Sequence, residues 1–101
     1  MTDDELQNCW PELGALVKEL RRINQAAVAD KLVEAFLAGS SSSEIVGKIG
    51  LILRDHRDLR PQLSDGAIAA WDAIMDNVAR ILRESKFAQW LERLAGQTGE
   101  R

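Results

Sequence analysis

Apolar residues recur every three or four positions along most of the chain, the spacing that places side chains on one face of an α-helix. Runs of β-branched residues in strict alternation, which would indicate half-buried strands, are absent. Short connections between the helical patterns favour antiparallel neighbours. We therefore predict an all-α fold, a compact antiparallel bundle of four to five helices. The first apolar stripe consists of Leu6, Trp10, Leu13, Val17 and Leu20.

The first stripe begins and breaks at recognisable residues. Thr2 and Glu5 have the spacing of a capping box, in which each side chain accepts a backbone N–H that lacks a helical partner. Pro11 interrupts the stripe, because proline donates no hydrogen bond and its ring clashes with the carbonyl four residues back. Two arrangements satisfy this constraint: a short helix that ends near Cys9, followed by one with Pro11 in its first turn, or a single helix kinked at Pro11. Asn24 is the predicted N-cap of the next helix.

Three further helical patterns follow. The first covers residues 25–38, with an inner face of Val28, Leu32, Ala35 and Phe36 and with Gly39 as its stop. Ser41 and Glu44 form a second capping box before a helix over residues 42–57, which is apolar around much of its circumference and is predicted to be central. Ser64 caps the last pattern, whose apolar positions are Ile68, Trp71, Ile74, Met75, Val78, Ile81 and Leu82. After a bend near Glu84 they continue as Phe87, Trp90, Leu91 and Leu94 up to Gly96.

Composition limits the class of protein. The chain has 101 residues, of which 46% are hydrophobic, so one small core is expected in a single helical-bundle domain over residues 1–96. Residues 97–101 are predicted to be a frayed polar tail. Thirteen Lys and Arg against 16 Asp and Glu give a net charge of −3, which disfavours nucleic acid or anionic lipid as a partner. The acidic N-terminus, the lack of a long apolar span and the single Cys predict a cytoplasmic protein.

The residues that could carry chemistry do not form a recognisable catalytic set. His56 lies between Asp55 and Arg57, but no Ser or Cys has a spacing that marks it as a nucleophile, so a structural role at a helix end is favoured. Asp72 and Asp76 lie four apart on one helix face, where Asp76 can pair with Arg80 rather than bind a metal. Phosphate-binding loops, dinucleotide fingerprints and zinc spacings are absent. We predict no enzymatic activity, no cofactor and no metal.

The lone thiol is also expected to be structural. Cys9 stands beside Trp10, and an unpaired cysteine in such a setting is more often a small buried apolar residue than a reactive group.

Residues 32–45, LVEAFLAGSSSSEI, resemble the opening of a LuxR-type helix-turn-helix. The resemblance implies a DNA-binding regulator. Apart from the resemblance, Arg54, Arg57 and Arg60 are the residues that such a regulator would use to contact the nucleic acid. A DNA-binding domain of this type also needs a second turn and a recognition helix, whereas residues 50–53 continue with apolar side chains. A nucleic-acid-binding regulator is therefore the alternative function.

The favoured function is protein–protein interaction. Gly47 and Gly50 make one flank of the helix over residues 42–57 small, which suggests either close packing within the chain or a groove for a partner. The last stripe can pack on the chain's own core or on a neighbour, and it contains a Trp, a residue enriched among interface anchors. The predicted contact residues are Phe87, Trp90, Leu91 and Leu94, followed by Gly47 and Gly50. The expected partner is another protein or a second copy of the chain, and the chain itself is expected to be a homodimer or a bacterial immunity, antitoxin or adaptor component.

This hypothesis predicts that replacing Trp90 weakens an association. Sedimentation of the pure protein should show a dimer, or a pull-down should recover a stoichiometric partner, and Trp90→Ala should reduce either complex because an aromatic anchor is lost. A strict monomer with Trp90 buried in its own core and no recovered partner would contradict the hypothesis.

Overall fold

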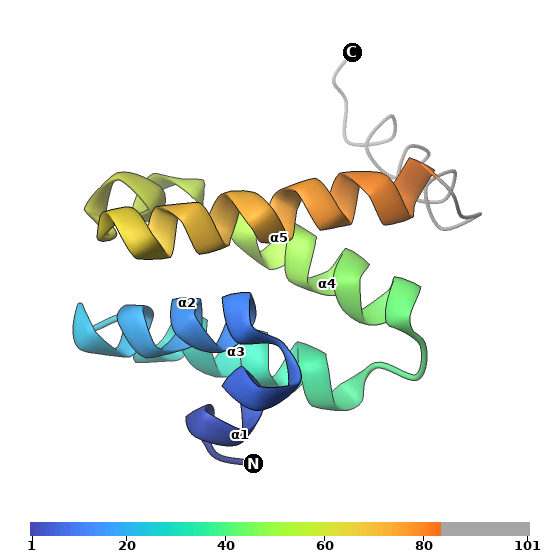
Figure 1. The fold of residues 1–101 in the computed structure, drawn as a ribbon, viewed down its shortest axis with the longest axis horizontal. Helices are drawn as coiled ribbons and strands as arrows, with labels where there is room; N and C mark the ends of the chain where they lie inside the picture. Colours follow the sequence, from blue (N-terminus) through green and yellow to red (C-terminus); the bar gives the residue numbers. More distant parts are fainter. Residues whose placement is uncertain (84–101) are drawn as a thin grey trace.

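The computed structural model describes residues 1–83, and every regular element in that range is a helix. The elements are α1 (Asp3–Cys9), α2 (Pro11–Arg22), α3 (Ala26–Ala38), α4 (Ser42–Asp55), the 3-10 helix η1 (Arg57–Gln62) and α5 (Asp65–Arg83) (Figure 1). The predicted all-α bundle is confirmed. No helix within residues 1–83 is long and apolar enough to cross a membrane.

The helix α2 has the most neighbours in the described bundle. It packs against α1, α3 and α5, whereas α4 packs against α3 and α5. Figure 1 shows α5 extended along one side of the molecule, with α2 beside it. The expectation that the helix starting at Ser42 is central is therefore wrong. The apolar face of α4 is broad, but it is α2 that is enclosed. The helices before and after α2 in the sequence, α1 and α3, both pack against it, and α5 covers a third side.

One continuous apolar core joins the helices. The buried residues among residues 1–83 are either apolar or glycine. The largest completely buried side chains are Leu6, Leu13, Leu16, Val17, Leu20, Leu32, Ile49, Leu53 and Ile74. Each such side chain contributes about 1.5–3 kcal/mol relative to an exposed one, so the core is the main source of stability.

Between the two arrangements that Pro11 allows, the structure contains two separate helices. The Thr2 capping box opens α1: the Thr2 N–H donates to Glu5 Oε1 at 2.7 Å, and the Glu5 N–H donates to Thr2 Oγ1 at 3.1 Å. Trp10 has extended backbone angles and separates α1 from α2, where Pro11 stands in the first turn. Proline is tolerated there, because the first N–H groups of a helix have no intrahelical acceptor.

The short α1 folds back against α2 at Gly14. A Cβ atom at Gly14 would lie 2.6 Å from the backbone nitrogen of Gln7, so only glycine permits this approach. Polar contacts on either side hold the two helices together. Lys18 Nζ lies 2.6 Å from Asp4 Oδ1, and Arg21 Nε lies 2.7 Å from Asp3 Oδ2.

The connection between α2 and α3 corrects the role predicted for Asn24. Asn24 has a φ of 66°, in the left-handed region, and it follows the C-cap Ile23 rather than capping α3. The Gln25 N–H donates to the Leu20 carbonyl at 2.7 Å and the Asn24 N–H to the Arg21 carbonyl at 3.3 Å. These two bonds are the Schellman pattern that ends a helix. Asparagine favours both an N-cap and this turn, and the sequence pattern alone did not separate them.

Serine side chains begin α4 and α5 as predicted. Ser41 Oγ accepts the Glu44 N–H at 3.2 Å, and Ser64 Oγ accepts the Ala67 N–H at 3.4 Å. The second capping box is shifted by one residue, because Glu44 Oε1 accepts the N–H of Ser40 at 2.9 Å instead of that of Ser41. The serine run is therefore an ordered connection.

The end of α4 also differs from the prediction. The α-helix stops at Asp55 rather than at residue 57, and η1 begins at Arg57. Leu59 in η1 and Leu63 after it are buried, at 5% and 6% exposure. These two leucines anchor the connection on the core and so direct the chain into α5.

Alanine substitutions at Gly50 and Gly66 should change the free energy of unfolding in opposite directions. A Cβ at Gly50 would lie 2.7 Å from Cγ1 of Val78, a stiff β-branched neighbour, whereas one at Gly66 would meet no atom within 4 Å. Gly50→Ala should lower the free energy of unfolding by about 1 kcal/mol, since overpacking outweighs the better helix propensity of alanine.

The matched control Gly66→Ala should raise the free energy of unfolding by about 0.5–1 kcal/mol, because alanine reduces the entropy of the unfolded chain. Urea unfolding measures both variants. A Gly50→Ala protein as stable as the wild type would show that Val78 does not restrict this position.

Candidate functional site

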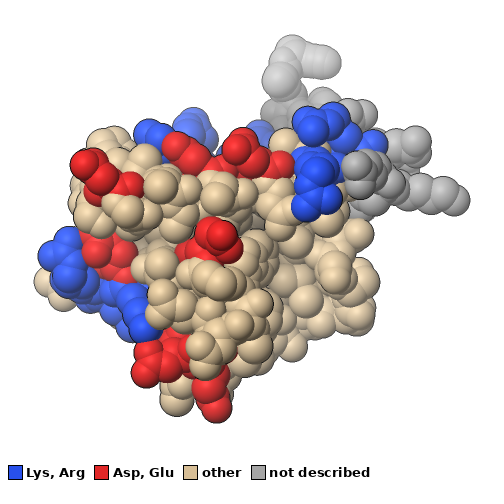
Figure 2. All heavy atoms as spheres, viewed as in Figure 1, with Lys and Arg blue, Asp and Glu red and all other residues tan. Residues whose placement is uncertain are grey.

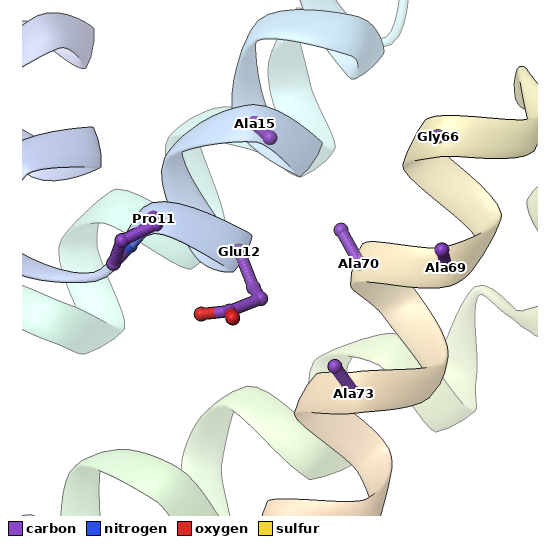
Figure 3. Close-up of a pocket in the computed structure, with 7 residues that line it drawn as sticks. All are labelled: Pro11, Glu12, Ala15, Gly66, Ala69, Ala70 and Ala73. Carbon is purple, nitrogen blue, oxygen red and sulfur yellow. The ribbon is translucent and has the colours of Figure 1, made fainter.

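The candidate site is a groove between α2 and α5. It has a volume of about 340 Å³ and opens to solvent (Figure 3). Its lining consists of Pro11, Glu12 and Ala15 from α2 and of Gly66, Ala69, Ala70 and Ala73 from α5. One residue of the seven is charged, so the groove is an apolar surface with a single ionic group.

The groove is hollow because α5 presents small residues along it. Gly66, Ala69, Ala70 and Ala73 follow the i, i+3, i+4, i+7 spacing of one helical face. The large side chains of α5 lie on a different face, where Trp71 is buried in the core. Two helices normally fill the space between them with side chains, but methyl groups and a glycine leave this one open.

Glu12 is the ionisable group of the groove. Figure 3 shows its side chain leaving α2 at the edge of the groove, with the carboxylate turned away from the alanines of α5. It is exposed, and no Lys or Arg among residues 1–83 forms an ion pair with it. By contrast, the next acidic residue of α2, Glu19, is paired. The groove therefore offers a carboxylate that is free to meet a cation.

A polar clamp joins α2 and α5 at the start of α5. Glu19 accepts two hydrogen bonds from Arg22, at 2.9 and 2.7 Å, and a third from the backbone N–H of Ser64 at 3.1 Å. These bonds to Arg22 and Ser64 lower the pKa of Glu19 to about 2. The clamp ties Ser64, the N-cap of α5, to α2 and so holds one end of the groove.

This arrangement can bind apolar side chains and one cation, but it holds no nucleophile or general base in a polar network. Within the described part of the chain, no group of three or more His, Cys, Asp or Glu side chains could hold a metal ion.

The contact residues predicted from the sequence lie elsewhere. Phe87, Trp90, Leu91 and Leu94 are outside the described residues. Gly47 and Gly50 are buried in α4, and the close approach at Gly50 is made within the chain, to Val78 of α5.

The other candidate residues occupy structural positions. His56 is half-buried at the C-cap of α4, where its backbone N–H donates to the carbonyls of Ile52 and Leu53. Arg60 forms a two-point contact with Asp72, at 3.0 and 2.7 Å, which lowers the pKa of that carboxyl group. Arg54 and Arg57 are exposed at the end of α4 and the start of η1.

Two expectations about single side chains are wrong. Cys9 is exposed rather than buried, because α1 ends there and Trp10 is the residue that packs against the core. Arg80 donates a hydrogen bond to Asn77, three residues earlier, instead of pairing with Asp76.

The groove residues are not among the contact residues predicted from the sequence, although the spacing of small residues indicates them. Small residues recur at helical spacing from Gly66 to Ala73, beside the stripe of large apolar residues that begins at Ile68. The spacing indicates a narrow helix face, but only the position of α2 turns that face into a groove.

Comparison with known proteins provides no further constraint on the site. No family model, curated protein or solved structure matches the chain.

The Glu19 clamp predicts a pH dependence of stability. Its pKa in the folded protein, about 2, is below the ordinary value of 4.5, so the stabilisation is complete above about pH 4.5 and is lost as the pH falls toward 2. Glu19→Gln should therefore lose less stability than the wild type between pH 4.5 and 2 in urea unfolding.

The matched control Glu12→Gln removes a carboxylate from the same helix but leaves the clamp intact, so it should keep the wild-type pH profile. Parallel profiles for Glu19→Gln and the wild type would show that the clamp does not stabilise the fold.

Proposed function

We propose that the protein is a non-enzymatic protein–protein interaction module that binds an α-helix of a partner in the groove between α2 and α5. The observation that carries this proposal is an open groove lined by four alanines, a glycine and a proline, with Glu12 as its one charged residue. Amphipathic helices bind by laying their apolar face into such a groove.

The geometry of the walls suits a helix. Helices pack with their axes about 8–10 Å apart, and the shorter distances require small side chains at the contact. On α5, Ala69 and Ala73 are exposed one turn apart, so they can admit the larger side chains of another helix. The rigid α2 and α5 hold both walls in place, and the Glu19 clamp secures one end.

Adaptors, antitoxins and immunity proteins act through binding alone, so a helix-binding module suits any of them. The exposed, unpaired Cys9 is compatible with a reducing compartment, and the cytoplasm is the proposed location. The nucleic-acid alternative gains no support from the described residues, because Arg60, one of the three arginines predicted to contact nucleic acid, is paired with Asp72.

Obstruction of the groove tests the proposal. Ala69→Gln adds a neutral side chain to the wall, whereas Ala79→Gln makes the same change at an exposed position of α5 outside the groove. Both sites are exposed, so both variants should stay within about 0.5 kcal/mol of wild-type stability. Ala69→Gln should weaken partner binding about tenfold or more, because overpacking a contact costs about 1–3 kcal/mol.

The measurement combines affinity capture with the three proteins and hydrogen exchange on the reconstituted complex. A partner retained by the wild type and Ala79→Gln, lost from Ala69→Gln, and protecting amides of α2 and α5 would support the proposal. Equal retention by both variants, protection confined to other helices, or a monomeric protein that captures nothing would overturn it.

A further inference from the structure

We propose that the helix bound in this groove is cationic and belongs to a different protein, with a Lys or Arg side chain that pairs with Glu12. The inference rests on the helix-binding function proposed above and deepens it by naming the chemistry of the partner. It follows from the distribution of charge around the groove.

The charged side chains that α5 places beside the groove are acidic. From Pro61 to Ala79 the sequence contains three aspartates and no Lys or Arg, and Asp65, Asp72 and Asp76 are all exposed on α5. Asp65 precedes Ala69 by four residues and Asp76 follows Ala73 by three, so both flank the helix face that lines the groove. Acidic side chains gather over α5 in Figure 2.

Most of these carboxylates have no ion-pair partner among the described residues. Arg60 pairs with Asp72, but Glu12, Asp65 and Asp76 form no ion pair with any residue from 1 to 83. By contrast, Arg21 on α2 contacts two carboxylates, those of Asp3 and Asp30. Three carboxylates in or beside the groove are therefore available to a cation of a partner.

This distribution selects between the possible occupants. A two-fold dimer through the groove would place the same surface on both sides, so Glu12, Asp65 and Asp76 would approach carboxylates of the second copy. Like charges across an interface are unfavourable, whereas complementary charges favour encounter and orientation. A helix with an apolar face and flanking Lys or Arg satisfies both the alanine wall and the acidic border.

Synthetic helical peptides test the charge requirement. Three peptides share one apolar face, with Leu at i, i+3, i+4 and i+7, and carry Lys, Gln or Glu at the remaining positions. They are titrated into the full-length protein by calorimetry at 50 and 500 mM NaCl. The Lys peptide should bind about tenfold or more tightly than the Glu peptide at low salt, and the difference should shrink at high salt.

Glu12→Gln should weaken binding of the Lys peptide about two- to fivefold, as expected for one exposed ion pair, and should leave binding of the Gln peptide unchanged. Glu34→Gln is the matched control, because Glu34 is an exposed carboxylate on α3, outside the groove. An equal effect of the two substitutions would overturn the pairing with Glu12.

The outcomes separate this inference from the proposed function. Equal binding of the three peptides that is still lost in Ala69→Gln would overturn the cationic partner but keep the helix-binding groove. A dimer in sedimentation that Ala69→Gln dissociates would likewise replace the partner with a second copy. Binding of the Lys peptide that Ala69→Gln leaves intact, or no binding of any peptide, would overturn both proposals.

Discussion

The burial of α2 on three sides is the constraint on which the described structure depends. Its leucines and Val17 are removed completely from water, which requires α1, α3 and α5 to pack around a helix of only 12 residues. The polar residues at its edges then become ties to those neighbours: Lys18 to α1, Arg21 to α1 and α3, and Glu19 to the start of α5. The same helix thus provides both the core and the connections around it.

The groove is a consequence of how α5 joins that arrangement. Trp71 and Ile74 supply the buried side of α5, while Ala69 and Ala73 meet the edge of α2 with side chains too small to fill the space. Gly50 makes the opposite kind of contact, because Val78 occupies the room that a side chain would take. Small residues therefore allow a close contact between α4 and α5 at Gly50, and they leave an open groove between α2 and α5 at Ala69 and Ala73.

The charges of the molecule divide in a related way. Arg21 of α2 is engaged by acidic residues of α1 and α3, whereas Asp72 is the one aspartate of α5 that pairs with a cation among residues 1–83. Exposed ion pairs contribute little to stability, so this division matters more for recognition than for folding. In the proposed function, an alanine wall with an acidic border would discriminate between partners by charge and by shape.

The sequence by itself determined the helical class, the interruption of the first apolar stripe at Pro11 and the helix starts at Thr2, Ser41 and Ser64, whereas the structure decided that Pro11 begins a separate helix. Those features depend on hydrogen bonds and steric contacts between residues within about four positions of one another. Asn24 shows where local information ended, since its two turn preferences were resolved only by the bond from Gln25 to Leu20.

The central place of α2, the exposure of Cys9 and the groove were decided by the tertiary structure alone. Each depends on which distant segments meet, as Ala15 and Ala69 do across the groove. Helical periodicity shows which face of a helix is apolar but not which helix will cover it, because packing energy depends on the shape and position of both surfaces.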